Sequence, residues 1–153
     1  SPITVMITRA DDFLFSGGKD SNIKKWRIAT GECLQTFINH CKGILELKLS
    51  PDGYHLYSTA GDLTIKRWKL ENSTCARSFN GHKGGTLKLA ISNDGRTLWS
   101  AGADGSVRVW PVANTSCLQA FQPTSKQITR FIVANDDKSV FIATSKQGSV
   151  KQF

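Results

Sequence analysis

FLFSGGKDSNIKKW, which spans residues 13–26, decides the fold because the chain repeats it at a constant interval. The second copy is HLYSTAGDLTIKRW at residues 55–68, and the third is TLWSAGADGSVRVW at residues 97–110. Each copy ends in tryptophan, and the start positions 13, 55 and 97 are equally spaced. A fourth copy, SVFIATSKQGSVKQF at residues 139–153, needs a one-residue insertion and ends in phenylalanine. The chain is therefore an array of repeats with a common period.

The apolar pattern within one repeat is that of β-strands. Apolar and polar residues alternate through ILELKLS at residues 44–50, and the Pro-Asp-Gly that follows has the chemistry of a turn. Helical repeats of similar length would instead place apolar residues three and four positions apart. In the second repeat we therefore expect four short strands, at residues 44–50, 55–60, 64–70 and 75–79.

A period of roughly 40 to 45 residues with four strands is typical of one blade of a β-propeller. The sequence thus predicts an all-β propeller segment of about four four-stranded antiparallel blades, the fourth degenerate and without its outer strand. The whole chain, residues 1–153, forms one partial propeller in this interpretation. The predicted blades cover residues 3–38, 44–80, 86–121 and 127–153.

The composition favours a folded chain that is soluble. Of the 153 residues, 39% are hydrophobic and 21% are charged, so the chain can bury a core. No apolar run approaches the roughly 18 residues of a membrane-spanning helix, and the sequence does not open on a basic stretch followed by an apolar one. We expect an intracellular protein of the cytoplasm or the nucleus that has no membrane anchor.

Three of the four cysteines, Cys33, Cys75 and Cys117, follow one another at the same interval as the repeated segments. Residues at one repeated position lie in successive units, so these thiols do not converge on a metal ion. No C-x-x-C pair occurs in the sequence. We predict reduced structural thiols and no metal site.

The repeats resemble the WD-repeat β-propeller family over essentially the whole chain. The family's Gly-His pair stands at Gly81-His82, with Asn39-His40 as a variant. Each of these histidines precedes a tryptophan by the same interval, and an aspartate lies six positions before each tryptophan. The resemblance implies a buried hydrogen-bonded network in two blades, formed by His40, Ser58, Asp62 and Trp68 in the second and by His82, Ser100, Asp104 and Trp110 in the third.

The sequence departs from the family pattern in its first and last repeats. The first repeat retains only Ser16, Asp20 and Trp26 of the network, and the fourth has Phe153 at the tryptophan position. No repeat contains the Trp-Asp dipeptide that gives the family its name. The fourth blade is therefore expected to be degenerate.

Histidine, serine and aspartate are also the residue types of a hydrolase triad, in which an imidazole held by a carboxylate activates a hydroxyl. The set occurs twice at one register, which favours the satisfaction of buried polar groups over catalysis. His55 lacks such partners and is expected in a turn, exposed to solvent. No phosphate-binding glycine loop, carboxylate pair or zinc-protease motif occurs. We predict no catalytic residue, no cofactor and no enzyme activity.

The net charge of +8 is the remaining functional signal. Lys42, Lys83 and Lys126 each precede a predicted inner strand, and a propeller would bring them to one rim together with Lys19. A cationic rim suits an acidic protein segment or the backbone of a nucleic acid. We predict a non-catalytic scaffold for protein–protein interactions within a larger assembly. The alternative is a nucleic-acid-binding propeller subunit that uses the basic rim.

The number of repeats also bears on the partners. The chain carries about 3.7 blades, roughly half of the seven that are usual in the family it resembles. An open arc leaves apolar faces and strand edges uncovered, and these favour association. We expect the partners to include the remaining blades of a larger propeller or a second copy of the chain.

Overall fold

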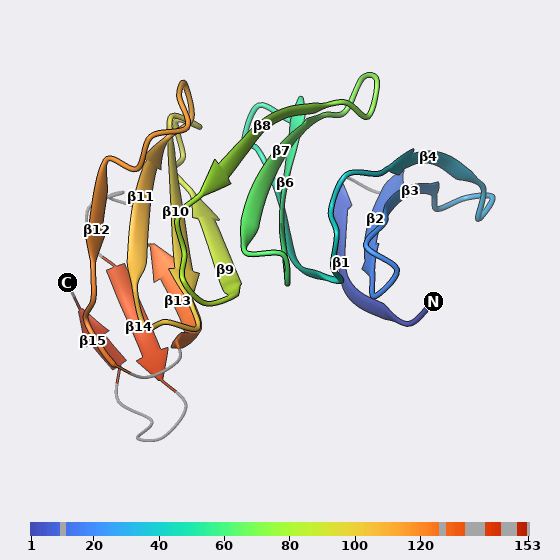
Figure 1. Ribbon diagram of the computed structural model, residues 1–153. Coiled ribbons are helices and arrows are strands. Elements are labelled where there is room, and N and C mark those ends of the chain that lie inside the picture. Colours follow the sequence, from blue (N-terminus) through green and yellow to red (C-terminus); the bar gives the residue numbers. More distant parts are fainter. Residues whose placement is uncertain (10–11, 126–127, 134–139, 145–149, 153) are drawn as a thin grey trace.

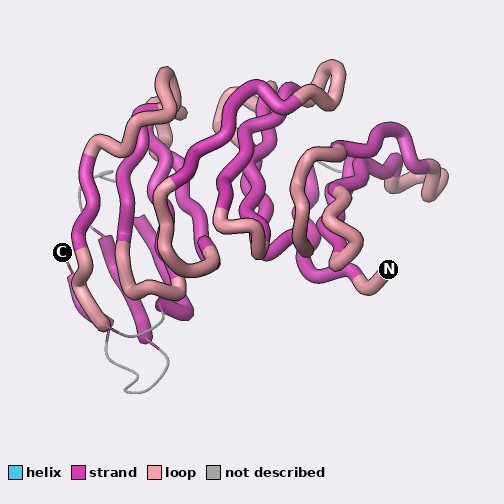
Figure 2. Tube along the Cα trace, in the orientation of Figure 1, coloured by secondary structure: helices cyan, strands magenta, loops and turns pink. Residues whose placement is uncertain are grey.

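The computed structural model describes residues 1–9, 12–125, 128–133, 140–144 and 150–152. Within these ranges the chain consists of strands, turns and loops, without a helix (Figure 2). The described residues accordingly include no helix that could cross a membrane. Fifteen strands are present in this part of the chain, and they form four antiparallel sheets (Figure 1).

Each sheet is built from consecutive strands. The first sheet contains β1 (Ile3–Arg9), β2 (Phe13–Gly18), β3 (Ile23–Arg27) and β4 (Cys33–Phe37). The second contains β5 (Ile44–Leu49), β6 (His55–Ala60), β7 (Thr64–Lys69) and β8 (Cys75–Asn80). The third contains β9 (Thr86–Ile91), β10 (Thr97–Gly102), β11 (Val107–Pro111) and β12 (Gln119–Phe121). The fourth contains β13 (Ile128–Val133), β14 (Val140–Thr144) and β15 (Val150–Gln152). The predicted all-β fold of four-stranded antiparallel units is confirmed.

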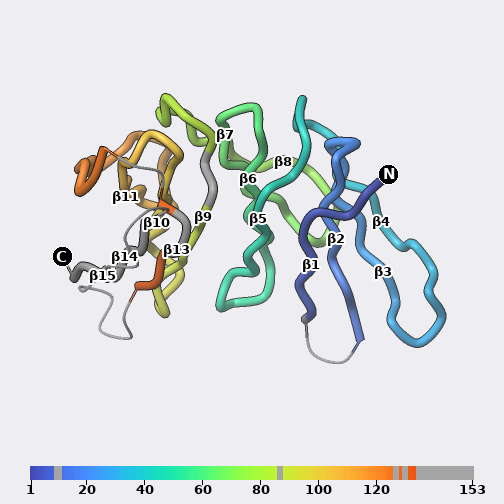
Figure 3. The backbone as a smooth tube through the Cα atoms, turned by 90° about the horizontal axis from the view of Figure 1, so that it is seen from below, coloured from blue at the N-terminus to red at the C-terminus, as the bar shows by residue number. Residues whose placement is uncertain are grey.

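The four sheets follow one another along an arc. The first sheet lies at one end and the fourth at the other, and the inner strands β1, β5, β9 and β13 are successive neighbours (Figures 1 and 3). From these inner strands the sheets fan outward, as the blades of a propeller do (Figure 3). Successive side chains of a strand point to opposite faces of its sheet. Because each sheet faces the next, one set of side chains lies toward the preceding sheet and the other set toward the following one.

The turn between the first two strands of a sheet recurs with the period of the sequence. In the second sheet the Ser50 hydroxyl donates a hydrogen bond to the Asp52 carboxylate, and the Gly53 N–H donates to the Ser50 carbonyl at 2.9 Å. Gly53 has a φ of 72°, a left-handed conformation that glycine adopts without steric cost. The same turn recurs at Gly95, whose φ is 70°. The turn residues in the sequence therefore set where β5 and β9 end.

The hydrophobic core is divided into clusters that lie between successive sheets. Phe37 of the first sheet packs edge-on against Trp68 of the second, with ring centroids 5.7 Å apart. Phe79 of the second sheet meets Trp110 of the third in the same manner at 5.9 Å. Both tryptophans are 1% exposed, and burial of such large side chains stabilises the fold by about 2 to 3 kcal/mol each. One sheet thus provides the cover for the next.

The first sheet has an uncovered apolar face. Met6 pairs with Ser16 as Leu47 pairs with Ser58 in the second sheet, so Met6 and Leu47 hold the same position. Met6 is 59% exposed, whereas Leu47 is 2% exposed. Trp26 likewise lies half-buried on this face. The first sheet covers Leu47 and Trp68 of the second sheet. The equivalent residues of the first sheet itself, Met6 and Trp26, are more exposed to solvent.

Candidate functional site

The second sheet contains a buried polar network that joins a loop to three other segments. His40 comes from the loop between β4 and β5, Ser58 from β6 and Trp68 from β7. The His40 Nε2 atom lies 2.7 Å from the Ser58 Oγ atom, and the Trp68 Nε1–H donates to that oxygen at 2.8 Å. The His40 Nδ1 atom lies 2.8 Å from Asp62 Oδ2, in the turn between β6 and β7. The structure therefore brings these four residues together.

The donors and acceptors fix the protons of this network. The Asp62 carboxylate can only accept, so the His40 Nδ1–H donates to it. In the neutral imidazole the Nε2 atom then accepts from the Ser58 hydroxyl, whose oxygen accepts from Trp68. The imidazole is neutral in this arrangement, and burial lowers its pKa although Asp62 opposes the shift. Partial burial raises the pKa of Asp62, but hydrogen bonds from the Cys41 N–H, His40 and Thr64 outweigh it and lower the pKa to about 2.

The third sheet repeats the network with one difference. The His82 Nε2 atom lies 2.7 Å from the Ser100 Oγ atom, and the Trp110 Nε1–H donates to the same oxygen at 2.8 Å. The His82 Nδ1 atom, however, is 3.5 Å from Asp104, and its nearer partner is the Ser106 hydroxyl at 3.1 Å. That hydroxyl donates to Asp104 at 2.6 Å. The contact between histidine and aspartate is therefore direct in the second sheet and relayed by a serine in the third.

Sequence reasoning missed one member of each network. Thr64 and Ser106 both place a hydroxyl on the aspartate two positions before them, at 2.8 Å and 2.6 Å, and both also reach the histidine. They are one repeat period apart and both carry a hydroxyl, so the repeat register already contained the signal. The first sheet has Asn22 at this position, whose backbone N–H donates to Asp20 at 3.2 Å.

The first sheet keeps a reduced version of the network. The Trp26 Nε1–H donates to the Ser16 Oγ atom at 2.8 Å, as in the other two sheets. Asp20 lies exposed, and its carboxylate accepts from the Asn22 N–H. The first sheet thus shares the contact between serine and tryptophan with the other two sheets.

The network has the order of a hydrolase triad but cannot be approached by a substrate. Ser58 and Ser100 are both 0% exposed, and each oxygen already accepts a hydrogen bond from a tryptophan N–H. A nucleophile must reach a carbonyl carbon outside the protein, which these hydroxyls cannot do. The arrangement instead satisfies buried polar groups and ties a loop to a turn.

The strand predicted at residues 55–60 is present, but the expectation that His55 lies exposed in a turn was wrong. The residue begins strand β6 and is half-buried, and an Arg67 guanidinium nitrogen lies 3.2 Å from its Nδ1 atom and 3.1 Å from its Nε2 atom. Burial lowers the pKa of His55, and the charge of Arg67 adds to this effect. The partner was hidden because Arg67 lies on the adjacent strand, 12 residues away in the sequence.

The networks also position the loops that carry two of the predicted lysines. The Asp62 carboxylate accepts from the Cys41 N–H at 3.0 Å, next to Lys42, and Asp104 accepts from the Lys83 N–H at 2.9 Å. Lys83 therefore shares its register with Cys41 and not with Lys42, so the lysines do not occupy one repeated position. Both of their side chains are exposed.

Lys19 and Lys42 lie at adjoining loops of the first two sheets. A methyl group placed on Gly43 would come 3.2 Å from the Lys19 Cα atom, so the turn that carries Lys19 touches the loop that carries Lys42. Lys19 is also exposed. Lys126, the fourth predicted member of the basic rim, lies outside the described residues.

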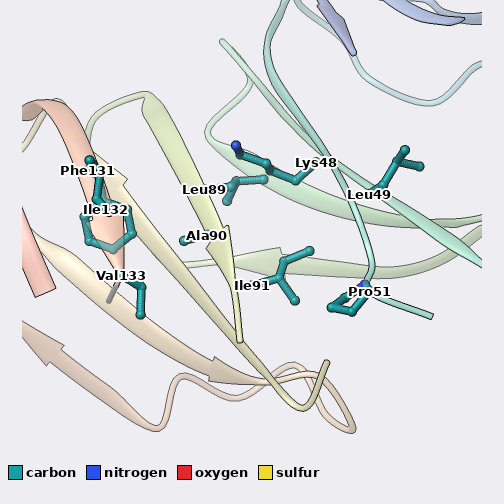
Figure 4. Close-up of a pocket in the computed structure, with 9 residues that line it drawn as sticks. All are labelled: Lys48, Leu49, Pro51, Leu89, Ala90, Ile91, Phe131, Ile132 and Val133. Carbon is teal, nitrogen blue, oxygen red and sulfur yellow. The ribbon is translucent and has the colours of Figure 1, made fainter. Parts of the chain in front are cut away.

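A cavity of about 330 Å³ lies on the inner strands β5, β9 and β13 (Figure 4). Its walls are mainly apolar, with Ile91, Phe131 and Ile132 among them, and of the described residues that line it only Lys48 is charged. The described lining therefore contains no acid–base pair. Among the described residues, moreover, no three His, Cys, Asp or Glu side chains are grouped so that they could hold a metal ion.

Comparison with known families explains the recurrence of these networks. Residues 31–69 and 73–111, about half of the chain, match the model of the WD domain, G-beta repeat. Each matched segment contains one complete network, from His40 to Trp68 and from His82 to Trp110. The chain belongs to the WD-repeat family. WD repeats are in general non-catalytic scaffolds that mediate protein–protein interactions.

Among curated proteins, this WD-repeat chain resembles two Lissencephaly-1 homologs. It is 44% identical over 46 residues to the protein of Heterostelium pallidum and 39% identical over 46 residues to that of Dictyostelium discoideum. In both cases the match covers 30% of this chain and 11% of the relative. The alignment thus spans about a tenth of the length of the curated relatives.

Among solved structures, the WD-repeat chain resembles the computationally designed Ika8 protein, with a TM-score of 0.87 and 27% sequence identity. The match covers 100% of this chain and 46% of the designed one. The successive sheets are therefore arranged as they are in a solved protein of about twice the aligned length.

Proposed function

We propose that this WD-repeat chain is a non-catalytic interaction scaffold that works within a larger assembly and binds an acidic protein segment at its basic loop edge. The basic loop edge is defined as Lys19, Lys42 and Lys83 with the loops that carry them. Family membership supports a protein-interaction role, and the burial of Ser58 and Ser100 opposes a hydrolytic one.

The proposal rests on the observation that partly buried carboxylates hold these loops in place while the lysine side chains stay exposed. Asp62 and Asp104 fix the backbone beside Lys42 and at Lys83, so part of the surface is formed before a partner arrives. A preformed surface loses little conformational entropy on binding. None of the three lysines forms an ion pair with a described carboxylate, which leaves their charges available to an acidic partner.

The uncovered face of the first sheet supports a place in a larger assembly. Ile3, Met6 and Ile28 are between 48% and 59% exposed there. The equivalent face of the second sheet is covered by the first sheet, whose Phe37 packs on Trp68. The partner with matching chemistry is a further blade of the same type, supplied by a larger propeller or by a second copy of the chain.

A charge-reversal experiment tests the basic loop edge. The variant Lys19→Glu/Lys42→Glu/Lys83→Glu is compared with the wild type for binding of a fluorescein-labelled oligoglutamate peptide, at low and at moderate salt. We expect binding to fall at least tenfold at low salt, mainly through a slower association rate, with an unchanged melting temperature. Exposed charges steer association and contribute little to folding.

The control variant is Lys48→Glu/Lys69→Glu/Arg96→Glu, which changes the net charge equally at exposed positions elsewhere. If both variants lose binding equally, net charge alone explains the effect and the proposed site is wrong. Tighter binding of a single-stranded RNA of equal charge, with a steeper salt dependence, would favour the nucleic-acid alternative.

A further inference from the structure

Leu63 occupies an unusual backbone conformation in the turn between β6 and β7. Its φ is 69°, in the left-handed region. Ser21 and Gly105 hold the same position in the first and third sheets, with φ values of 69° and 75°. In all three turns the N–H of this residue donates to the carbonyl three positions earlier, at 3.2 to 3.3 Å. The conformation therefore belongs to the repeat and is not caused by leucine.

A leucine is poorly suited to this position. Left-handed backbone is unfavourable for residues other than glycine, because the Cβ atom crowds the neighbouring carbonyl oxygen. The side chain does not gain compensating burial, since Leu63 is 40% exposed and belongs to none of the hydrophobic clusters of the described residues. Folding alone would favour glycine or asparagine here. An exposed residue held in an unfavourable conformation is a reason to look for a binding role.

The surroundings of Leu63 belong to the basic loop edge. The Gly61 N–H donates to the Gly43 carbonyl at 3.0 Å, which joins the Leu63 turn to the Lys42 loop. A methyl group placed on Gly61 would lie 3.4 Å from the Lys42 Cβ atom, so the carbon stem of Lys42 runs beside this turn. Lys19 adjoins the same loop at Gly43. The turn that carries Leu63 thus adjoins the Lys42 loop, and the Lys42 loop adjoins the turn that carries Lys19.

We propose that Leu63 is the apolar contact of the basic loop edge, and that the partner is an acidic protein segment with one large apolar side chain that packs on Leu63. This inference rests on the proposed function and adds the chemistry of the partner. Carboxylates of the segment would face Lys19 and Lys42, and its apolar side chain would cover the exposed part of Leu63. Leu63 and Lys42 offer aliphatic carbon and no aromatic ring, which suits a protein side chain better than a nucleic-acid base.

Two labelled twelve-residue peptides of equal charge test the proposal. Both consist of Asp and Glu around a central residue, which is Phe in one peptide and Ser in the other. Fluorescence anisotropy at low salt should show that the wild-type chain binds the Phe peptide roughly tenfold more tightly. In Leu63→Gly this preference should disappear, while the lysine-dependent binding that both peptides share remains.

Ser21→Gly is the matched control, because it makes the same backbone change in the equivalent turn of the first sheet. It should keep the preference for the Phe peptide. Both variants should melt at the wild-type temperature or above, since glycine fits the left-handed turn. The proposal is overturned if Leu63→Gly keeps the preference, if Ser21→Gly loses it as well, or if the wild type has none. If the wild-type chain binds neither peptide, the proposed function fails together with this inference.

Discussion

The two histidine networks provide a direct comparison of one interaction at two distances within one chain. His40 and Asp62 are 2.8 Å apart, whereas His82 and Asp104 are 3.5 Å apart and relayed by Ser106. Both histidine side chains are almost completely buried, at 0% and 1% exposed. We expect the coupling energy between histidine and aspartate to be larger in the second sheet than in the third.

The contacts of His40 determine how much stability its replacement should cost. His40→Ala removes hydrogen bonds to Ser58 and Asp62, leaves the Ser58 hydroxyl without its acceptor and opens a cavity, which together cost about 2 to 4 kcal/mol. For a chain of this size that corresponds to a loss on the order of 10 °C in melting temperature. Replacing both His40 and Asp62 should cost about 1 to 2 kcal/mol less than the two single changes added together. For His82 and Asp104 the difference between the summed single changes and the double change should be about half as large or smaller, because their direct contact is longer.

Two double-mutant cycles with alanine, measured by urea unfolding under identical conditions, give both coupling energies. The cycle in the third sheet serves as the control for the one in the second sheet, because the burial and the serine and tryptophan partners match. Equal coupling energies, or a larger one for His82 and Asp104, would refute the reasoning from distance. Full additivity in both cycles would show that the network does not act as a unit.

Two further outcomes can be measured on the same protein. Burial lowers the pKa of both His40 and His82, so below about pH 6.5 the unfolded chain binds more protons than the folded chain and stability falls. The pKa of Asp62 is lowered from 3.8 to about 2, so this carboxylate adds to the loss of stability below about pH 3.8. Melting temperatures should change little between pH 8 and about pH 7 and should fall on further acidification to pH 4; the reasoning is wrong if they rise. Light scattering should show that the chain self-associates and that Met6→Asp on the uncovered face reduces this association. Leu118→Asp, at an apolar side chain that is 71% exposed in the loop before β12, should not reduce it. A monodisperse, cooperatively melting wild-type monomer would contradict this expectation.

The repeat period made the fold and much of the network predictable from sequence. Strand alternation and turn chemistry are local properties, so they can be read within one repeat, and the period then transfers them to the next. Trp68 and Trp110 each donate to a serine on the adjacent strand, and the two pairs occupy equivalent positions in their sheets. His55 was misjudged because its contact with Arg67 depends on the side-chain packing of the adjacent strand.

The sequence by itself determined the strands, their turns and the residues that could meet in a network, because these depend on short-range backbone preferences repeated at a fixed interval. The tertiary structure alone decided which equivalent positions are buried and how close the partners come. Trp26 and Trp68 hold the same register, yet only Trp68 is fully covered, because burial depends on the sheet that lies against it. Likewise, His40 touches its aspartate directly whereas His82 reaches its own through Ser106, since differences below one ångström come from the packing of neighbouring side chains.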